Sequence, residues 1–214
     1  LATAHGGLNK IDLNTKPFFN IGAQYFNPNS LSSNLINGLT IDSKQRLWVG
    51  TFQNGVNVSK SPFTVDSIYQ TNFDHYLPNS SINCLLETPE GLMLIGTSKG
   101  LKIYDDQKEM FVVMNQQNPL LQSIRQAPIT AIIQVDNIIW LSTSSDLYKI
   151  ILNNGFSDIF TNNFKYEKID RSRLKKDGSS LNINTLLYDT LSGLWIGTRD
   201  GLFLLKEEEN GRQD

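Results

Sequence analysis

The side chains that could do chemistry in this sequence lie in short polar loops, most of which follow a recurring threonine. Amides, cations and a carboxylate in such loops are groups that recognise sugar hydroxyls and carboxylates. A loop is also polar simply because it contacts water, so each residue has a second interpretation as ordinary surface. The candidate ligand-binding residues are His5, Gln53, Asn54, Lys99, Arg125, Arg199 and Asp200.

Other kinds of site find little support in the sequence. His5 and His75 are the only histidines, and neither has a metal-type partner at short spacing, so we expect no metal and no cofactor. Asp105 and Asp106 are adjacent rather than opposed, unlike the carboxylate pair of glycoside hydrolysis. Phosphate-binding glycine patterns and Gly-x-Ser-x-Gly are missing, and we expect no catalytic residue. Cys84, the single cysteine, lies in an apolar segment and is expected to be buried.

The composition excludes several partners. The chain has 214 residues, 19 basic and 21 acidic side chains, and a formal net charge of -2. Nucleic-acid and polybasic membrane binders need clustered positive charge, so we expect no nucleic-acid partner. No run approaches the roughly 20 apolar residues of a membrane helix, and residues 1–7 lack the pattern of a signal peptide. Any membrane attachment would come from another part of a longer protein.

The elements that position the polar loops recur at a fixed period. Six-residue apolar segments end in a threonine, as in Arg-Leu-Trp-Val-Gly-Thr at 46–51, and these threonines are spaced by 46, 46 and 55 residues. An isoleucine precedes each threonine by 14 or 15 residues. A period of this length indicates a repeat architecture. The paired anchors are Ile36 and Thr51, Ile82 and Thr97, Ile129 and Thr143, and Ile183 and Thr198.

Each repeat is predicted to form short strands. In one copy, the pattern predicts strands over 82–87, 92–97, 100–104 and 111–114, with a turn at 88–91. Four short strands per repeat are typical of a β-propeller blade. We therefore predict an all-β fold, with blades of four antiparallel strands, about four to five blades, and a partial or small propeller.

The whole chain is predicted to be one propeller fragment over residues 1–214. Because residues 1–30 and 179–214 make only partial blades, we expect the chain to be a piece of a longer protein. A four-bladed ring, an open arc and an arc completed by another copy all remain possible, and exposed strand edges favour association. Complete repeats are expected over residues 31–77, 78–124 and 125–178, the last with a basic insertion around 156–180 that is expected to be a solvated loop or hairpin.

The bulky and small residues of the repeat are expected to control how blades pack. Trp48, Trp140 and Trp195 are predicted to fill the wedge between neighbouring sheets, where an aromatic of this size dominates the packing energy. The glycine before the repeated threonine is expected to allow close approach of two sheets, as at Gly50 and Gly197.

The pattern resembles the two-component regulator propeller repeat. The copy over 183–202 carries it best, with Asp189, Trp195 and Gly197 in place between Ile183 and Leu202. The copy over 36–56 also matches. The other two copies depart from the pattern, because Leu94 replaces tryptophan in one, and Ser142 and Asp146 replace glycines in the other.

The resemblance implies a function that the residues alone do not give. Such repeats form the periplasmic sensor region of Bacteroidetes-type hybrid two-component systems, which combine a histidine kinase with a response regulator. By this resemblance, the chain would bind an oligosaccharide or other small ligand, contact other propeller blades or a second sensor subunit, and signal to a kinase absent from this chain. It would not be an enzyme. Two alternatives remain open: a propeller enzyme such as a polysaccharide lyase or lactonase, and a protein-binding scaffold.

Overall fold

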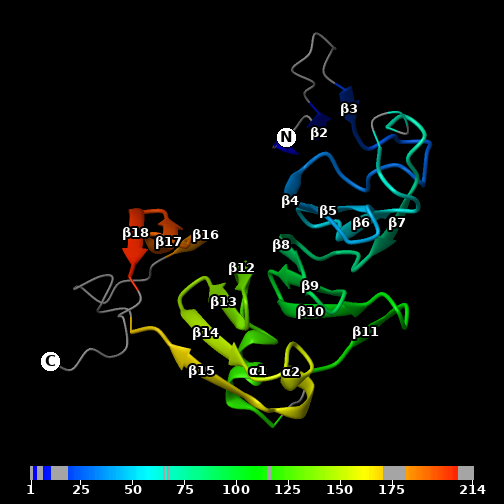
Figure 1. Cartoon of the computed structure of the whole chain (residues 1–214). Coiled ribbons are helices and arrows are strands. Elements are labelled where there is room, and N and C mark those ends of the chain that lie inside the picture. Colours follow the sequence, from blue (N-terminus) through cyan, green and yellow to red (C-terminus); the bar gives the residue numbers. More distant parts are fainter. Residues whose placement is uncertain are drawn as a thin grey trace, which may run out of the picture. The chain divides into compact units, whose positions relative to one another are not determined.

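The computed structural model describes the backbone at residues 2–3, 7–10, 19–64, 66, 68–114, 117–170 and 182–206, and the side chains from residue 19 onward in these ranges. These residues form antiparallel sheets with two short helices, which confirms the predicted all-β fold of four-stranded blades (Figure 1). The chain divides into two compact units, Leu1–Val113 (the N-terminal unit) and Met114–Asp214 (the C-terminal unit).

The N-terminal unit contains three sheets in which each strand pairs with the next one along the chain. The strands of the first sheet are β1 (Ala2–Thr3), β2 (Gly7–Lys10) and β3 (Phe19–Ile21). The strands of the second sheet are β4 (Ile36–Ile41), β5 (Leu47–Thr51), β6 (Val56–Ser59) and β7 (Phe73–Tyr76). The strands of the third sheet are β8 (Ile82–Glu87), β9 (Leu92–Thr97), β10 (Gly100–Asp105) and β11 (Met110–Val112).

The C-terminal unit contains two sheets with the same meandering order. The strands of the first are β12 (Ile129–Val135), β13 (Ile138–Thr143), β14 (Leu147–Leu152) and β15 (Phe164–Lys168). The second contains β16 (Ile183–Asp189), β17 (Gly193–Thr198) and β18 (Gly201–Leu205). The helices are α1 (Pro119–Ile124) and α2 (Asp158–Thr161). The insertion around 156–180 therefore includes a helix and the fourth strand of a sheet.

The repeated isoleucine and the repeated threonine are cross-strand partners. Ile82 at the start of β8 pairs with Thr97 at the end of β9, and the register then shifts by one residue so that Cys84 faces Gly96. Such a bulge bends the strand and redirects the side chain next to it. The pairing explains the constant spacing of the two anchors in the sequence. The same pairing and shift occur at Ile36 and Thr51, Ile129 and Thr143, and Ile183 and Thr198.

Neighbouring sheets of the N-terminal unit pack through the repeated tryptophan. Trp48 of β5 is 1% exposed and lies in one apolar cluster with Ile82 and Ile95 of the next sheet. Its ring meets that of Tyr104 edge-on, with centroids 5.8 Å apart. A Cβ added to Gly50 would lie 2.6 Å from Cγ2 of Ile82, so glycine is needed for this approach. Trp48 and Gly50 therefore both lie at the contact between these two sheets.

The C-terminal unit repeats this packing once and then departs from it. Trp140 is 1% exposed and shares a cluster with Ile183 and Leu194 of the following sheet. Trp195 is only half-buried, although it was predicted to fill the same kind of wedge. The crowding at Gly197 comes from Thr185 of its own sheet, at 2.6 Å, rather than from a neighbouring sheet.

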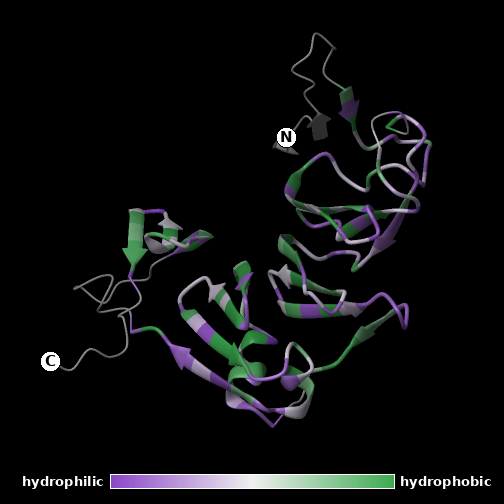
Figure 2. Cartoon of the chain, viewed as in Figure 1, coloured by the Kyte–Doolittle hydropathy of each residue, from purple (hydrophilic) through white to green (hydrophobic). Residues whose placement is uncertain are grey.

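Hydrophobic residues concentrate in the strands and polar residues in the turns, as the alternation of the sequence predicts (Figure 2). His75 lies in the outer strand β7, where Nε2 contacts the carbonyl oxygen of Ser30 at 2.8 Å. Cys84 is half-buried in β8, less than the sequence predicted, because β8 is the edge strand of its sheet. No helix in the described part of the chain is long and apolar enough to cross a membrane.

Candidate functional site

The repeated threonine closes the turn that carries the predicted ligand-binding residues. In the β9–β10 turn, Thr97 Oγ1 donates to the carbonyl oxygen of Gly100 at 2.7 Å and accepts from the backbone N–H of Lys99 at 3.0 Å. A hydroxyl that both donates and accepts fixes the path of a short loop. The other three repeated threonines donate in the same way to a backbone carbonyl oxygen: Thr51 to that of Gly55 at 2.8 Å, Thr143 to that of Asp146 at 3.4 Å and Thr198 to that of Gly201 at 2.9 Å.

In the N-terminal unit, Ser81 ties two of these turns together. Its hydroxyl oxygen accepts from the backbone N–H of Gln53 at 3.2 Å, and its carbonyl oxygen accepts from the N–H of Ser98 at 3.0 Å. The N–H of Gly55 also donates to the carbonyl oxygen of Ser80 at 2.9 Å. The β5–β6 turn, the β9–β10 turn and the segment before β8 therefore form one surface. We call this surface the rim and define it as residues 52–54, 80–81 and 98–99.

The rim brings together three of the residues predicted from the sequence. Gln53 and Lys99 are exposed, and within the described residues neither side chain makes a hydrogen bond or an ion pair. Asn54 is exposed too, but its amide nitrogen donates to the carbonyl oxygen of Ser32 at 2.8 Å, so its role is partly structural. The sequence analysis missed Phe52, a residue that is 44% exposed and directly precedes Gln53. Its place directly after the repeated threonine is the signal that could have identified it.

The chemistry of the rim suits a ligand rich in hydroxyl or carboxylate groups. The amide of Gln53 offers donors and an acceptor, and the ammonium of Lys99 offers three donors and a positive charge. The Phe52 ring offers an apolar surface beside them. Gln53 has a φ of 69°, and the hydrogen bond from its N–H to Ser81 holds the backbone in that conformation. The loop is thus ordered before any ligand binds, which lowers the entropic cost of binding.

The remaining predicted residues lie elsewhere. Arg125 is the exposed C-cap of α1 and lines a shallow, mostly polar depression of about 540 Å³ on that helix. Arg199 and Asp200 are exposed in the turn between β17 and β18. His5 lies outside the described residues. Arg125 therefore belongs to α1, whereas Arg199 and Asp200 belong to the β17–β18 turn.

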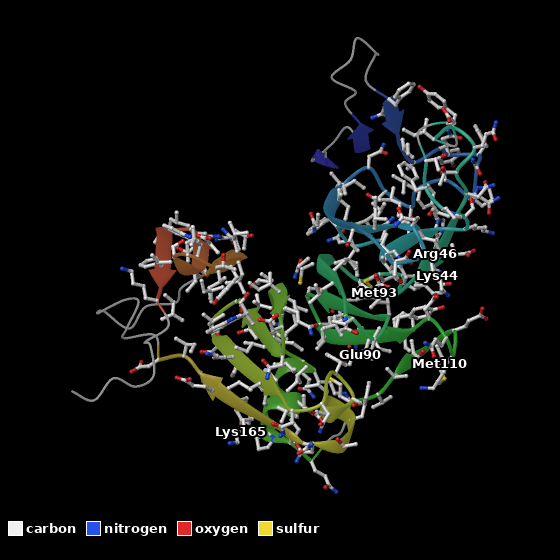
Figure 3. The ribbon with its side chains drawn as sticks, viewed as in Figure 1. Lys44, Arg46, Glu90, Met93, Met110 and Lys165 are labelled. Carbon is white, nitrogen blue, oxygen red and sulfur yellow. The ribbon has the colours of Figure 1, made fainter. Side chains whose placement is uncertain are left out.

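A charged cluster lies at the opposite strand ends from the rim. Arg46 Nη2 is 2.7 Å from a carboxylate oxygen of Asp42 and 2.7 Å from one of Asp106, and Lys44 also contacts Asp106 (Figure 3). Asp42 additionally accepts from the indole N–H of Trp48 at 2.8 Å. The cluster therefore links the β4–β5 turn to the segment after β10. We call it the charged seam, and its role is structural, because its groups satisfy one another.

The environment of the charged seam shifts the pKa of its outer carboxylate. Partial burial raises the pKa of Asp106, but hydrogen bonds from Lys44 and Arg46 and their positive charges outweigh burial. The pKa of Asp106 is therefore below its ordinary value. Over the part of the chain that the structure describes, no group of three His, Cys, Asp or Glu residues could hold a metal ion. The predicted absence of a cofactor stays a prediction.

Comparison with known proteins identifies the repeat. The family model of the two-component regulator propeller matches residues 30–53 and 76–99. These segments contain the first two isoleucine–threonine pairs and, in the β5–β6 and β9–β10 turns, most of the rim. No curated protein sequence matches the chain.

Solved structures resemble the chain at low identity, and the fold argument rests on the first of the two below. The extracellular domain of BT4673 from B. thetaiotaomicron, described as a one-component system, is 21% identical, with a TM-score of 0.67 over 98% of this chain and 27% of that one. The extracellular domain of the hybrid two-component system BT3049 from the same organism is 20% identical, with a TM-score of 0.48 over 94% of this chain and 31% of that one. The chain thus spans less than a third of either domain.

An enzyme also has a related fold. The catalytically inactive virginiamycin B lyase of Staphylococcus aureus is 14% identical, with a TM-score of 0.51 over 82% of this chain and 56% of that one. Fold alone therefore does not separate sensors from enzymes. The repeat is more specific, because its isoleucine, tryptophan, glycine and threonine each have a defined place in the blades described above. Two segments of the chain, residues 30–53 and 76–99, thus match the two-component regulator propeller repeat, and both lie in the N-terminal unit.

Proposed function

We propose that the chain is an extracytoplasmic ligand-sensing module and that the rim of its N-terminal unit binds a glycan fragment. The observation that carries the proposal is the joint anchoring of the Gln53 and Lys99 loops on Ser81. The repeat family supports a role in sensing. The kinase that receives the signal would be outside this chain, and the sensor would be periplasmic.

The rim could recognise a sugar in two ways at once. Gln53 and Lys99 would hydrogen-bond hydroxyl or carboxylate groups, and a charged donor is worth about 1.5–3 kcal/mol when its bond is well formed. The exposed face of Phe52 would pack against the apolar face of a sugar ring. Lys99 favours acidic sugars over neutral ones, since its charge gains most from a carboxylate partner.

Isothermal titration calorimetry against a panel of neutral and acidic oligosaccharides tests this proposal. We expect binding by the unmodified chain and a loss of about tenfold or more in affinity for Lys99→Ala toward acidic members, because one charge-assisted bond disappears. Gln53→Ala should lower the affinity for neutral and acidic oligosaccharides alike.

Lys60→Ala is the matched control for the titration. Lys60 is an exposed lysine that pairs with Asp74 at 3.2 Å, and it follows β6 at the end of the sheet opposite the rim. Its removal should leave the affinity unchanged. If Lys99→Ala, Gln53→Ala and the unmodified chain bind with equal affinity, the rim is not the binding site. If no oligosaccharide of the panel gives a heat of binding, the proposed function is contradicted.

A further inference from the structure

One buried carboxylate ties together the two ends of the connection between β14 and β15. Asp158, at the start of α2, is 3% exposed. It accepts hydrogen bonds from the backbone N–H groups of Asn153 and Asn154, both at 2.6 Å, and from the side-chain amide of Asn163 at 3.2 Å. The first of these asparagines directly follows β14, and the last directly precedes β15 (Figure 1). We call residues 153–163 the clamp loop.

The hydrogen bonds of the clamp loop keep Asp158 ionised. The backbone N–H of Asn154 lowers the pKa of Asp158 most, and the N–H of Asn153 and the side-chain amides of Asn163 and Asn154 act in the same direction. Together they outweigh burial, so the pKa of Asp158 lies below its ordinary value. The clamp loop therefore holds one negative charge at neutral pH, and its amide donors stabilise that charge.

Asn154 has the sequence neighbour that makes an asparagine chemically labile. Gly155 follows it, and because glycine has no Cβ, its backbone nitrogen can approach the side-chain carbonyl carbon of the preceding asparagine. The carbonyl oxygen of Gly155 accepts from the N–H of Asp158 at 3.2 Å. Its own N–H, in contrast, makes no hydrogen bond to any residue that the structure describes. The attacking nitrogen is therefore not held in a hydrogen bond.

Two further Asn–Gly pairs lie in the described part of the chain, and the fold restrains both. In the pair at 54–55, the glycine N–H donates to the carbonyl oxygen of Ser80 at 2.9 Å, and the asparagine amide donates to that of Ser32 at 2.8 Å. The pair at 37–38 lies in β4, whose backbone pairs with β5. Another pair, at 210–211, lies outside the described residues. The same dipeptide thus occurs in different backbone environments within one chain.

We propose that Asn154 is a site of spontaneous deamidation and that its product loosens the clamp loop. The backbone nitrogen of Gly155 attacks the side-chain carbonyl carbon of Asn154 and forms a cyclic succinimide. The side-chain amide nitrogen leaves as ammonia and carries away the proton that the Gly155 nitrogen loses. Water then adds to one of the two ring carbonyls and opens the ring to aspartate or isoaspartate. Water is the only co-reactant.

The product places a second carboxylate beside that of Asp158. In the unmodified chain, the side-chain amide of Asn154 hydrogen-bonds Asp158, and deamidation removes this donor. Two carboxylates in contact repel each other, and isoaspartate also lengthens the backbone of the clamp loop. Because β15 is the outermost strand of its sheet among the described residues, weaker anchoring of its first residue favours its separation from β14. The reaction is independent of the rim and of the proposed ligand.

Peptide mapping by mass spectrometry, after incubation of the chain at mildly alkaline pH, tests the reaction. We expect Asn154 to deamidate about tenfold faster than Asn54, because the hydrogen bond from Gly55 to Ser80 must break before Gly55 can attack. The control is the same incubation in denaturant, where both asparagines precede glycine in an unfolded chain and should react at similar rates. Equal rates at the two asparagines in the folded chain would overturn the proposal.

Hydrogen exchange in Asn154→Asp, which carries the product's charge from the start, tests the structural consequence. We expect the amides of β15 to exchange about tenfold faster than in the unmodified chain, since the strand loses part of its anchoring, while those of β9 stay unchanged. Asn54→Asp is the matched control, because it makes the same change in another Asn–Gly pair and should leave β15 as it is. Unchanged exchange of β15 in Asn154→Asp would overturn the proposed loosening of the clamp loop.

Discussion

At the scale of single residues, the same position in the repeat meets different environments. The indole N–H of Trp48 donates directly to Asp42 at 2.8 Å, whereas that of Trp195 donates to Ser192 at 3.1 Å. Among the described residues, the N–H of the buried Trp140 has no hydrogen-bond partner. An unsatisfied buried donor costs free energy, so the third repeat keeps its tryptophan for packing rather than for a hydrogen bond.

Asp106 gives a prediction about acid stability. Its pKa is lower in the folded chain than in the unfolded one, so its ionised form stabilises the fold above the unfolded pKa, near 3.8. That contribution disappears as the pH falls through the lower, folded pKa. Asp106→Asn should therefore destabilise the chain at pH 7, and the difference in free energy of unfolding between variant and unmodified chain should shrink as the pH falls below about 4.

Denaturant titrations at several pH values measure this difference. Asp74→Asn is the control, because Asp74 pairs with Lys60 while its side chain is 50% exposed, and a surface pair of that kind contributes little at any pH. A difference for Asp106→Asn that stays constant down to pH 2 would show that the charged seam does not act through the charge of Asp106.

At the scale of the elements, the central contact is that of Gly50 with Ile82. Gly50→Ala places a methyl group 2.6 Å from Cγ2 of Ile82 and should destabilise the chain by about 1–3 kcal/mol, because neighbouring sheets must move apart. Thermal or denaturant unfolding measures the loss. The cost should be smaller in an Ile82→Ala background, where the clashing Cγ2 is gone.

Gly38→Ala is the control for this prediction. Gly38 lies in β4 of the same sheet, and an added Cβ would have its nearest neighbour at 3.5 Å, an ordinary contact. Its replacement should therefore cost little. An equal loss for both alanine variants would indicate a general penalty for replacing strand glycines and would remove the steric role assigned to Gly50.

The repeat made the blades predictable from the sequence, whereas details that depend on tertiary contacts could not be predicted. Predicted strands at 82–87 and 92–97 agree with β8 and β9, because a fixed period and apolar runs suffice to place them. Helix α1 was missed, since six residues are too few to show a helical period. Its N-cap, Asn118, accepts from the N–H of Leu120 at 2.9 Å and was the available signal.

The candidate site was predictable in part for the same reason. Gln53 and Lys99 follow the repeated threonines, so the sequence indicated their loops. Their joint anchoring on Ser81 depends on the packing of one sheet against the next, and no spacing in the sequence encodes it. The half-buried state of Trp195 was not predictable either, because its motif is the same as that of the buried Trp48.

At the scale of the whole molecule, the N-terminal unit presents a polar rim, and the C-terminal unit exposes the apolar residues Leu187 and Leu202. These surfaces have different chemistry and lie in different compact units. A ligand that binds through amides and an ammonium group would use the rim. The clamp loop lies in the other unit, so the two proposals can fail independently.

The central claim is that the rim of the N-terminal unit binds the ligand. Its most direct test is a map of backbone amide chemical shifts in the ¹⁵N-labelled chain, titrated with the oligosaccharide that gives the most heat in calorimetry. The account predicts the largest shifts at residues 52–54, 80–81 and 98–99, where the loop amides are anchored on Ser81 or lie beside it. The largest shifts around Leu187 and Leu202 or around Arg125, with the rim unchanged, would contradict it.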